Sequence, residues 1–391
     1  MSSKRGPQAP RRGRPRQADV AREAGVSQTT VSLVLGGNKQ GIVIQEATRV
    51  RVLEAARSLG YVPDPAARSL AAARNSLLGV FSFTATFPTD ERHSYYPLLA
   101  GVEQEAAAQG YDLVLFTGSS AHGPAATTPE ALDRVRLADG CLFLGRHIPA
   151  RELRRLVQDG YPAVHIGRRD ELEGLAWVGA DYVSASADVV RHLAEAGHRR
   201  IVLVREDDDA PASTDRERGF LLGLERAGLP GGPETVARTA EPAAEITAER
   251  VRAWRAAGVT AFVAEETDTG GAWRALFGAV GAAGLEAPRD LSLALLGAPP
   301  ADLGAEPVPT GFDVPRTELG ATAVRLLVSV MAGEEPEQGA SGAVPGPAVP
   351  GPLVPCAFRA GATAGPPPET APETAPETAP EAAPGAAPDG G

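Results

Sequence analysis

The stretch RRGRPRQADVAREAGVSQTTVSLVL, residues 11–35, joins five arginines to two short amphipathic patterns. The first pattern predicts a helix that begins at Gln17, because its apolar residues recur at the spacing of one helix face. That face consists of Val20, Ala21 and Ala24. Gly25 follows at the place where such a helix ends, since glycine adopts the left-handed conformation of a C-cap at little cost.

A second short helix is predicted after Ser27, a residue type that caps helix N-termini. Two short helices joined by a tight, glycine-containing turn form a helix-turn-helix. The second helix has an apolar side of Val31, Val34 and Leu35 and an opposite side of Gln28, Thr29, Ser32 and Leu33. Amide, hydroxyl and small apolar groups suit the base edges of a DNA major groove, and the alternative is an ordinary solvated helix face.

The next two segments predict a third helix and a very short fourth one. In EATRVRVLEAARSLG, residues 46–60, the predicted inner face is Val50, Leu53, Ala56 and Leu59, and Gly60 ends the helix. Asp64 and Pro65 then form an N-cap and first-turn pair for a helix over 65–73. Two turns are marginal in isolation, because nucleation is unfavourable and few residues repay it.

Positive charge gathers at the N-terminal end. Residues 1–76 hold 13 Lys and Arg against 5 Asp and Glu, a net charge of +8, whereas the rest holds 25 against 44, a net charge of −19. A basic head on an acidic body is expected when one module approaches a polyanion. Residues 1–16 lack apolar periodicity and are expected to be a disordered basic arm. The alternative is a basic tag without such a partner.

From Leu77 onward, short apolar strands alternate with amphipathic helices, which predicts parallel sheets with crossover helices. The predicted strands include LLGVFSF, YDLVLF, GCLFLG, PAVHIG, RIVLVR, TAFVA and LSLALL. Residues 77–360 exceed what one such sheet commonly uses, so we expect two lobes. The repeat PETAPETAPETAPEAAP lies within residues 361–391, which are expected to form a disordered Pro/Ala/Glu/Thr tail.

Composition narrows the class of protein further. No run of about 18 apolar residues could span a bilayer, and no apolar segment of the secretory type follows the basic N-terminus, so a cytoplasmic protein is expected. Cys141 and Cys356 have neither zinc-site spacing nor the number of a disulfide framework. The sequence lacks GxSxG, GxxxxGK[ST], GxGxxG and HExxH motifs, so we expect no enzyme, metal or cofactor.

Several of these segments together resemble the LacI/GalR family of bacterial transcriptional repressors. The resemblance rests on ADVAREAGVSQTTVSLVL, TRVRVLEAARSLGYVPDPAARSL, LLAGVEQEAAAQGYDLVL, DGCLFLG, HLAEAGHRRIVLV, RERGFLLGL and LGATAVRLL. It covers roughly residues 17–360. It implies a helix-turn-helix DNA-binding domain at 17–62, a hinge helix and linker at 63–76, and a two-lobed, periplasmic-binding-protein-like core for effector binding and dimerisation at 77–360.

The resemblance also assigns the DNA contacts. Gln28, Thr29 and Leu33 match base-reading positions, with Ser32 beside them. Leu70 matches the hinge leucine that is wedged into the minor groove, with the small Ala67 next to it; the alternative for Leu70 is a core contact. RGRPR, with Arg12, Arg14 and Arg16, is similar to an AT-hook that lies in narrow A/T grooves, or it is a merely electrostatic arm.

The implied effector site lies between the lobes. Arg168, Asp181, Arg216 and Glu266 match its polar positions, and Tyr95, Tyr96, Trp177 and Trp273 are candidate stacking platforms. Arginines and carboxylates together can hold the hydroxyls of a sugar-like or nucleoside-like molecule. The alternatives are solvated or paired roles for Arg168 and Glu266 and a core position for Trp273.

This sequence departs from the family pattern at several positions. Gly36 replaces the asparagine that usually ends the recognition helix, and Gln45 replaces the usual serine cap of the third helix. Ala298, Pro299 and Pro300 stand where the family typically has an aromatic residue and an acid. A regulator that is insensitive to an effector, or that responds to something other than a sugar, is therefore the alternative for this cleft.

The expected partners are a pseudo-palindromic double-stranded DNA operator, a small-molecule effector and a second copy of the chain, with a homodimer or a higher assembly and no membrane. One rival is an extracytoplasmic sugar-binding protein, which would have a signal peptide and no helix-turn-helix. A second rival is a nucleoid-type binder that uses the basic arm without sequence choice. Footprinting on a palindrome separates that binder from a repressor.

Overall fold

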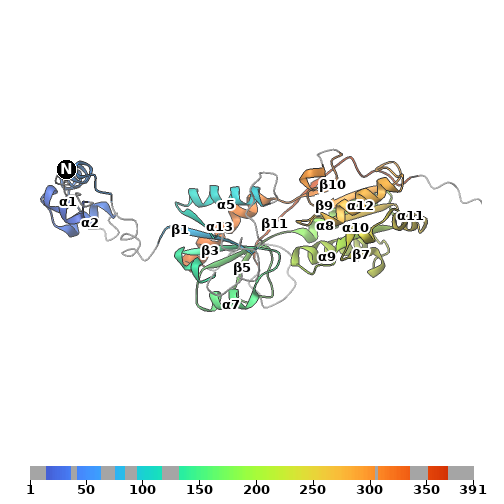
Figure 1. Cartoon of the computed structure of the whole chain (residues 1–391), viewed down its shortest axis with the longest axis horizontal. Coiled ribbons are helices and arrows are strands. Elements are labelled where there is room, and N and C mark those ends of the chain that lie inside the picture. Colours follow the sequence, from blue (N-terminus) through green and yellow to red (C-terminus); the bar gives the residue numbers. More distant parts are fainter. Residues whose placement is uncertain are drawn as a thin grey trace, which may run out of the picture.

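The computed structural model describes residues 15–36, 42–62, 75–83, 95–116, 132–303, 307–334 and 351–368. These residues form a three-helix head and two α/β lobes, each built on one sheet (Figure 1). The expected architecture, a helical head followed by a two-lobed core of parallel sheets, is confirmed. The predicted helix over 65–73 lies outside the described residues, as do residues 1–14 of the arm.

The head contains α1 (Gln17–Ala24), α2 (Gln28–Leu35) and α3 (Glu46–Leu59). Gly25 has the left-handed conformation, with φ 61°, and ends α1 as predicted. The Ser27 hydroxyl accepts the backbone N–H of Thr30 at 3.1 Å and caps α2. Gln45 precedes α3 without a side-chain cap, as its side chain is too long to replace serine there. Local capping chemistry therefore fixes the helix-turn-helix.

The predicted inner face of α3 is wrong in part. Val50 and Leu53 are 43% and 37% exposed, whereas Val52, Ala55 and Ala56 are buried in the head core. Both sets have helical spacing, so periodicity alone did not distinguish them. The stripe with the two alanines faces inward, because small side chains let α3 approach α1 closely.

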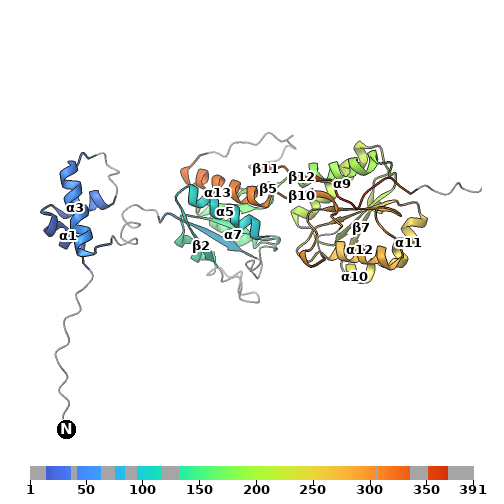
Figure 2. The ribbon, with the colours of Figure 1, turned by 90° about the horizontal axis from the view of Figure 1, so that it is seen from above.

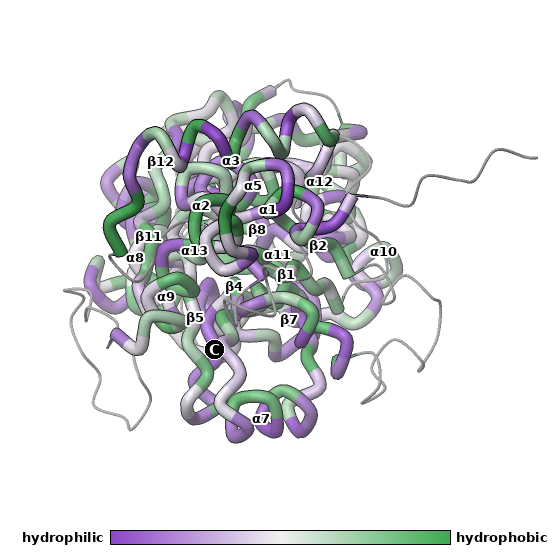
Figure 3. Tube along the Cα trace, turned by 90° about the vertical axis from the view of Figure 1, so that its left-hand side faces the viewer, coloured by the Kyte–Doolittle hydropathy of each residue, from purple (hydrophilic) through white to green (hydrophobic). Residues whose placement is uncertain are grey.

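The first lobe has a six-stranded sheet in the order β11-β5-β4-β3-β1-β2. Its strands are parallel, and β3 is buried along its whole length, as expected for a sheet covered on both faces. The lobe comprises β1 (Leu77–Ser82), α5 (Tyr96–Ala108), β2 (Asp112–Phe116), β3 (Gly140–Leu144), α7 (Ala150–Gln158), β4 (Ala163–Ile166), β5 (Ala176–Ala180), α13 (Arg316–Ala332) and β11 (Leu353–Val354). Figure 3 shows hydrophobic and hydrophilic residues alternating along α7, whose Leu153 and Leu156 are buried.

The second lobe has the order β12-β10-β9-β8-β6-β7, with only β12 antiparallel among its described strands. The lobe comprises α8 (Tyr182–Glu195), β6 (Ile201–Glu206), α9 (Pro211–Arg226), β7 (Val236–Thr239), α10 (Pro242–Glu245), α11 (Ala248–Ala256), β8 (Ala261–Glu265), α12 (Gly271–Ala282), β9 (Ser292–Leu296), β10 (Thr310–Asp313) and β12 (Ala357–Arg359). The chain passes between the lobes after β5, after β10 and after β11. Residues at these crossovers lie where the lobes face each other.

Helix α13 returns to the first lobe and packs on α5, as Figures 1 and 2 show. Two glycines allow this close approach. A Cβ atom on Gly101 would lie 1.9 Å from the carbonyl oxygen of Thr317, and one on Gly320 would lie 2.2 Å from that of Leu98. The pair of helices therefore holds the start of α13 firmly at the lobe junction.

The expected boundary between core and tail, at residue 360, is too early. Thr363 is fully buried; its hydroxyl donates to the carbonyl of Leu293 at 2.6 Å and accepts the N–H of Thr310 at 3.0 Å. Ser292 bonds Gly365 and the ring of the buried His198. Residues 361–368 thus pack on the second lobe through hydrogen bonds that their Gly- and Pro-rich composition does not reveal.

Candidate functional site

The predicted base-reading face lies on the outer side of α2. Gln28, Thr29 and Ser32 are exposed, and Leu33 is half-buried. The inner side of the same helix is fixed by the buried Val31 and Val34 in the head core. The head therefore presents a short row of amide and hydroxyl groups on a helix whose core side is packed.

The other predicted DNA contacts fall in part outside the described residues. Arg12, Arg14, Ala67 and Leu70 lie there, so their assignments stay predictions. Arg16 is exposed, and its backbone N–H donates to Asp19 at 2.8 Å at the start of α1.

A cavity of about 170 Å³ lies between the two lobes, smaller than the roughly 300–1,000 Å³ of typical small-molecule sites. It contains Arg168, Arg216 and Glu266, three of the four polar residues that the sequence predicted there. The first lobe and α13 line it with Tyr95, Leu98, Gly145, Arg146, Ile166, Gly167, Arg168, Arg169, Val178, Gly179, Ala180, Arg316 and Leu319, and the second lobe and its crossovers with Tyr182, Ala210, Pro211, Ala212, Asp215, Arg216, Glu266, Thr267, Asp268 and Val314.

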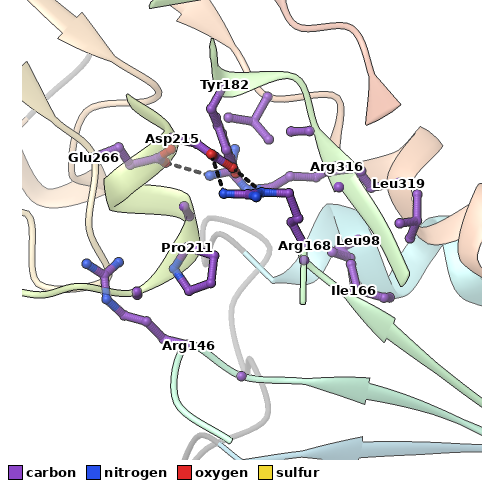
Figure 4. A pocket seen from close by; sticks show the side chains of 18 of the residues that line it. Leu98, Arg146, Ile166, Arg168, Tyr182, Pro211, Asp215, Glu266, Arg316 and Leu319 are labelled. Carbon is purple, nitrogen blue, oxygen red and sulfur yellow. Dashed lines mark hydrogen bonds and ion pairs between the residues drawn. The ribbon is translucent and has the colours of Figure 1, made fainter. Parts of the chain in front are cut away.

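Arg168 spans the cavity from the end of β4 to α9 (Figure 4). Its Nε donates to Asp215 Oδ2 at 2.8 Å, and its Nη2 donates to Oδ1 at 2.5 Å. Arg168 also pairs with Asp170 on its own lobe. Burial raises the pKa of Asp215 above its ordinary value, and the hydrogen bonds from Arg168 offset only part of that rise. This two-bond pair holds the lobes together across the cleft.

Glu266 lies between two arginines. Arg216 Nη2 donates to its Oε2 at 3.3 Å, and Arg316 Nη2 donates to its Oε1 at 2.5 Å. Arg216 is nearly buried; its Nε donates to the carbonyl of Leu296 at 2.9 Å, and its guanidinium carbon lies 3.9 Å from the centre of the Tyr182 ring. Because Arg316 begins α13, this carboxylate joins the second lobe to a helix of the first.

A further interlobe contact involves Arg146, at the end of β3. Arg146 pairs with Asp208 of the second lobe, and its Nη2 donates to the Ser213 hydroxyl at 2.7 Å. Ser213 in turn donates to the buried Glu265 at 2.6 Å.

Arg146 and Asp215 are not among the residues predicted from the sequence. The signal was present, since Gly-Arg follows both β3 and β4 at the same edge of the sheet.

The aromatic predictions are mostly incorrect. Trp177 and Trp273 are buried in the lobe interiors and are no platforms for a ligand. Tyr96 is 47% exposed and is not part of the cavity lining. Tyr95 does line the cavity, and its hydroxyl donates to Asp268 at 3.4 Å. The presence of an aromatic residue in the sequence does not by itself show whether its side chain lies in the core or in the cleft.

Asp181 and the altered motif Ala298, Pro299 and Pro300 are not part of the cavity lining. Asp181 is at the first crossover, as expected, but it accepts the N–H of Ser184 and caps α8. Ala298, Pro299 and Pro300 follow β9 and do not line the cavity either. The altered motif therefore contributes no side chain to the cavity, where the resemblance places an aromatic residue and an acid near the ligand. The polar groups of the cavity come from the arginine and carboxylate pairs.

Other kinds of site are not evident in the described part of the chain. No group of His, Cys, Asp and Glu side chains there is arranged to hold a metal ion, and no described helix is long and apolar enough to cross a membrane. Both cysteines are free thiols, and burial raises the pKa of Cys356 to about 12 and that of Cys141 well above its usual value. The arginine and carboxylate groups of the cavity thus carry its chemistry.

Head and core each match a known class of domain. Residues 18–64 match the lacI family of bacterial regulatory proteins, and residues 190–351 match the periplasmic binding protein-like domain. The chain belongs to the lacI family of DNA-binding transcriptional regulators.

Individual relatives support the same assignment. Catabolite control protein A of Streptococcus mutans is 31% identical over 323 residues, which cover 82% of this chain and 92% of that protein. The structure of the transcriptional regulator CelR with cellobiose has a TM-score of 0.57 at 24% identity and covers 90% of this chain and all of that one. The lac repressor dimer bound to operator and the anti-inducer ONPF has a TM-score of 0.63 at 20% identity, with the same coverage. Both structures share the fold.

Proposed function

We propose that this chain is a sequence-specific repressor that binds an inverted-repeat operator as a homodimer in the cytoplasm. One recognition helix reads too few base pairs for specificity in a genome, and a two-fold protein requires a two-fold site. The observation that carries this proposal is the exposed amide and hydroxyl face of α2, on a capped helix with a packed inner side. The solved lac repressor dimer, bound to operator, supports this arrangement by analogy of fold.

Gln28, Thr29, Ser32 and Leu33 read bases in this proposal, and the arm with Arg12, Arg14 and Arg16 contacts phosphates. Leu70 enters a base step of the minor groove, with Ala67 beside it. The segment around Leu70 is too short for a helix that is stable alone, so it orders on DNA. Folding of this segment on DNA would connect the position of the core to that of the head.

Gln28→Ala is expected to lower affinity for the operator by about 5- to 150-fold, because a lost bidentate contact to adenine costs roughly 1–3 kcal/mol. Affinity for a scrambled duplex should stay within about twofold, since phosphate contacts carry no sequence information. Fluorescence anisotropy with both duplexes measures this. The control is Ser58→Ala, which removes from α3 a hydroxyl that donates to the carbonyl of Ala55 within the same helix. Equal losses on both duplexes would contradict base reading by Gln28.

We further propose that the interlobe cavity binds a neutral polyhydroxy effector, a sugar or a nucleoside. A ligand hydroxyl both donates and accepts hydrogen bonds, and the cavity offers partners for each. The donors are Arg168, Arg216 and Arg316, and the acceptors are Asp215 and Glu266. The CelR structure with cellobiose supports this class of ligand. The present cavity is small, so binding requires the lobes to separate first.

A specific observation supports a second candidate, a regulator that needs no effector. Arg168 with Asp215, Arg146 with Asp208, and Arg316 with Glu266 already join the lobes. A thermal-shift screen of sugars and nucleosides separates the two. A compound that raises the melting temperature of the parent, but not of a Glu266→Gln variant, favours an effector in this cavity. No shift across the panel favours the second candidate.

A further inference from the structure

Two backbone N–H groups meet one carboxylate where the chain enters the core. The N–H of Asn75 donates to Asp139 Oδ1 at 2.6 Å, and the N–H of Ser76 donates to Oδ2 at 2.8 Å. The side-chain amide of Asn75 also donates to the carbonyl of Leu137 at 2.8 Å. Both oxygens of Asp139 are thus engaged by the last residues before β1. Successive N–H groups that converge in this way form an anion-binding concavity, here filled by a side chain of the same protein.

The backbone of Ser76 is held in a strained conformation. Its φ is 54°, and among the described residues it is the one non-glycine residue with a positive φ. Such a conformation costs free energy and persists only when the surroundings enforce it. The carbonyl of Ser76 accepts the N–H of Asp112, and the carbonyl of Leu77 accepts the N–H of Asp139. Asp139 therefore holds Ser76 between β2 and the start of β3.

Helix α13 connects this place to the interlobe cavity. Its first residue, Arg316, pairs with Glu266 in the cavity. Near its other end, Met331 lines a hollow together with Asn75 and Asp139. A Cβ atom on Gly140, the residue after Asp139, would lie 3.0 Å from Met331 Sδ. A 17-residue helix is about 25 Å long, so α13 extends from the cavity to the residues around Asp139.

We propose that Asp139 is a positioning residue that clamps the core end of the linker and sets where the segment of residues 63–74 leaves the core. In a dimer the two clamps fix where the two linkers begin. This inference rests on the proposed function, because it assumes operator binding by a dimer. Asp139 contacts no DNA in this account; it acts through the linker.

Asp139→Asn tests the clamp, because the amide keeps the size of the side chain but replaces one acceptor by a donor. The variant is expected to lose about tenfold or more of its affinity for the selected operator, while affinity for a scrambled duplex stays within about twofold. If Asp139 had a merely structural role, the substitution would lower the melting temperature of the core and leave the ratio of operator affinity to scrambled-duplex affinity unchanged. The melting temperature is therefore measured alongside. The matched control is Asp133→Asn, an exposed carboxylate six residues earlier in the chain, just before the short helix Arg134–Leu137.

Ser76→Pro keeps the test valid if Asp139→Asn fails to fold. Ser76 is exposed and precedes β1, and proline can neither take a positive φ nor donate an N–H. The same loss of operator preference is expected. A parent that binds no inverted repeat would contradict the proposed function. A parent that binds one, with variants whose preference equals the parent's, would overturn the clamp alone.

Discussion

Val31→Asp is expected to abolish operator binding by unfolding the head while the two lobes stay folded. Val31 is fully buried in a core of eight residues, five of which are alanine or valine side chains from α1 and α2. A head of under 50 residues has only a few kcal/mol of stability. An unpaired carboxylate in that core costs about as much or more, so the folded head is lost.

The loss should reach roughly 10³-fold or more, the usual gap between specific and non-specific DNA binding. Operator titration measures it, and calorimetry should show the thermal transition of the lobes unchanged. The control is Val43→Asp, which adds the same charge at a residue that is 93% exposed and should change the affinity for the operator by less than about tenfold. A Val31→Asp protein that binds the operator like this control would show that the helix-turn-helix is not the reader.

Arg168→Ala is expected to destabilise the core by about 2 kcal/mol and to let the lobes separate. Removing one partner of a buried ion pair costs roughly 3–5 kcal/mol, and solvent screening lowers that cost here because the Arg168 side chain is 27% exposed. Asp215 would be left nearly buried without its two hydrogen bonds. The melting temperature should fall by several degrees, and the radius of gyration should rise. Arg191→Ala is the control, since Arg191 pairs with Asp188 and Glu195 at the surface.

The loss of stability in Arg168→Ala should depend on pH because Asp215 is titratable. Burial already raises its pKa in the folded protein, and removal of Arg168 raises it further. A carboxyl group with a raised folded-state pKa costs stability above that pKa, and the cost disappears as the pH falls through it. The difference in melting temperature between parent and variant should therefore be larger at about pH 7.5 than at about pH 5. A difference that grows on acidification would contradict the role of Asp215.

Local signals in the sequence predicted the head well. Gly25 and Ser27 act through backbone conformation and capping, which depend on one or two residues and can be recognised without the rest of the fold. The inner face of α3 was assigned incorrectly in part, because Val50 and Val52 belong to equally regular stripes. The choice between those stripes depends on packing against α1, which is a tertiary contact.

The cavity was predicted only in part for the same reason. Arg168, Arg216 and Glu266 were found through the family resemblance, whereas their partners Asp215 and Arg316 were not. These partners lie 47 and 50 residues away in sequence. Such pairings depend on the crossovers that bring β4, α9 and α13 to one place. Residues 361–368 were missed because their order comes from bonds to Ser292 and Leu293 and from no pattern of their own.

Selection of binding sites from random duplex DNA by the full-length protein tests the central claim most directly. We expect an enriched inverted repeat, with half-sites centred about one helical turn apart, bound by two copies of the chain. The stoichiometry can be read from the mass of the complex. Enrichment of a single unrepeated site bound by one copy, or of no sequence at all, would contradict the assignment of this chain as a dimeric, operator-specific repressor.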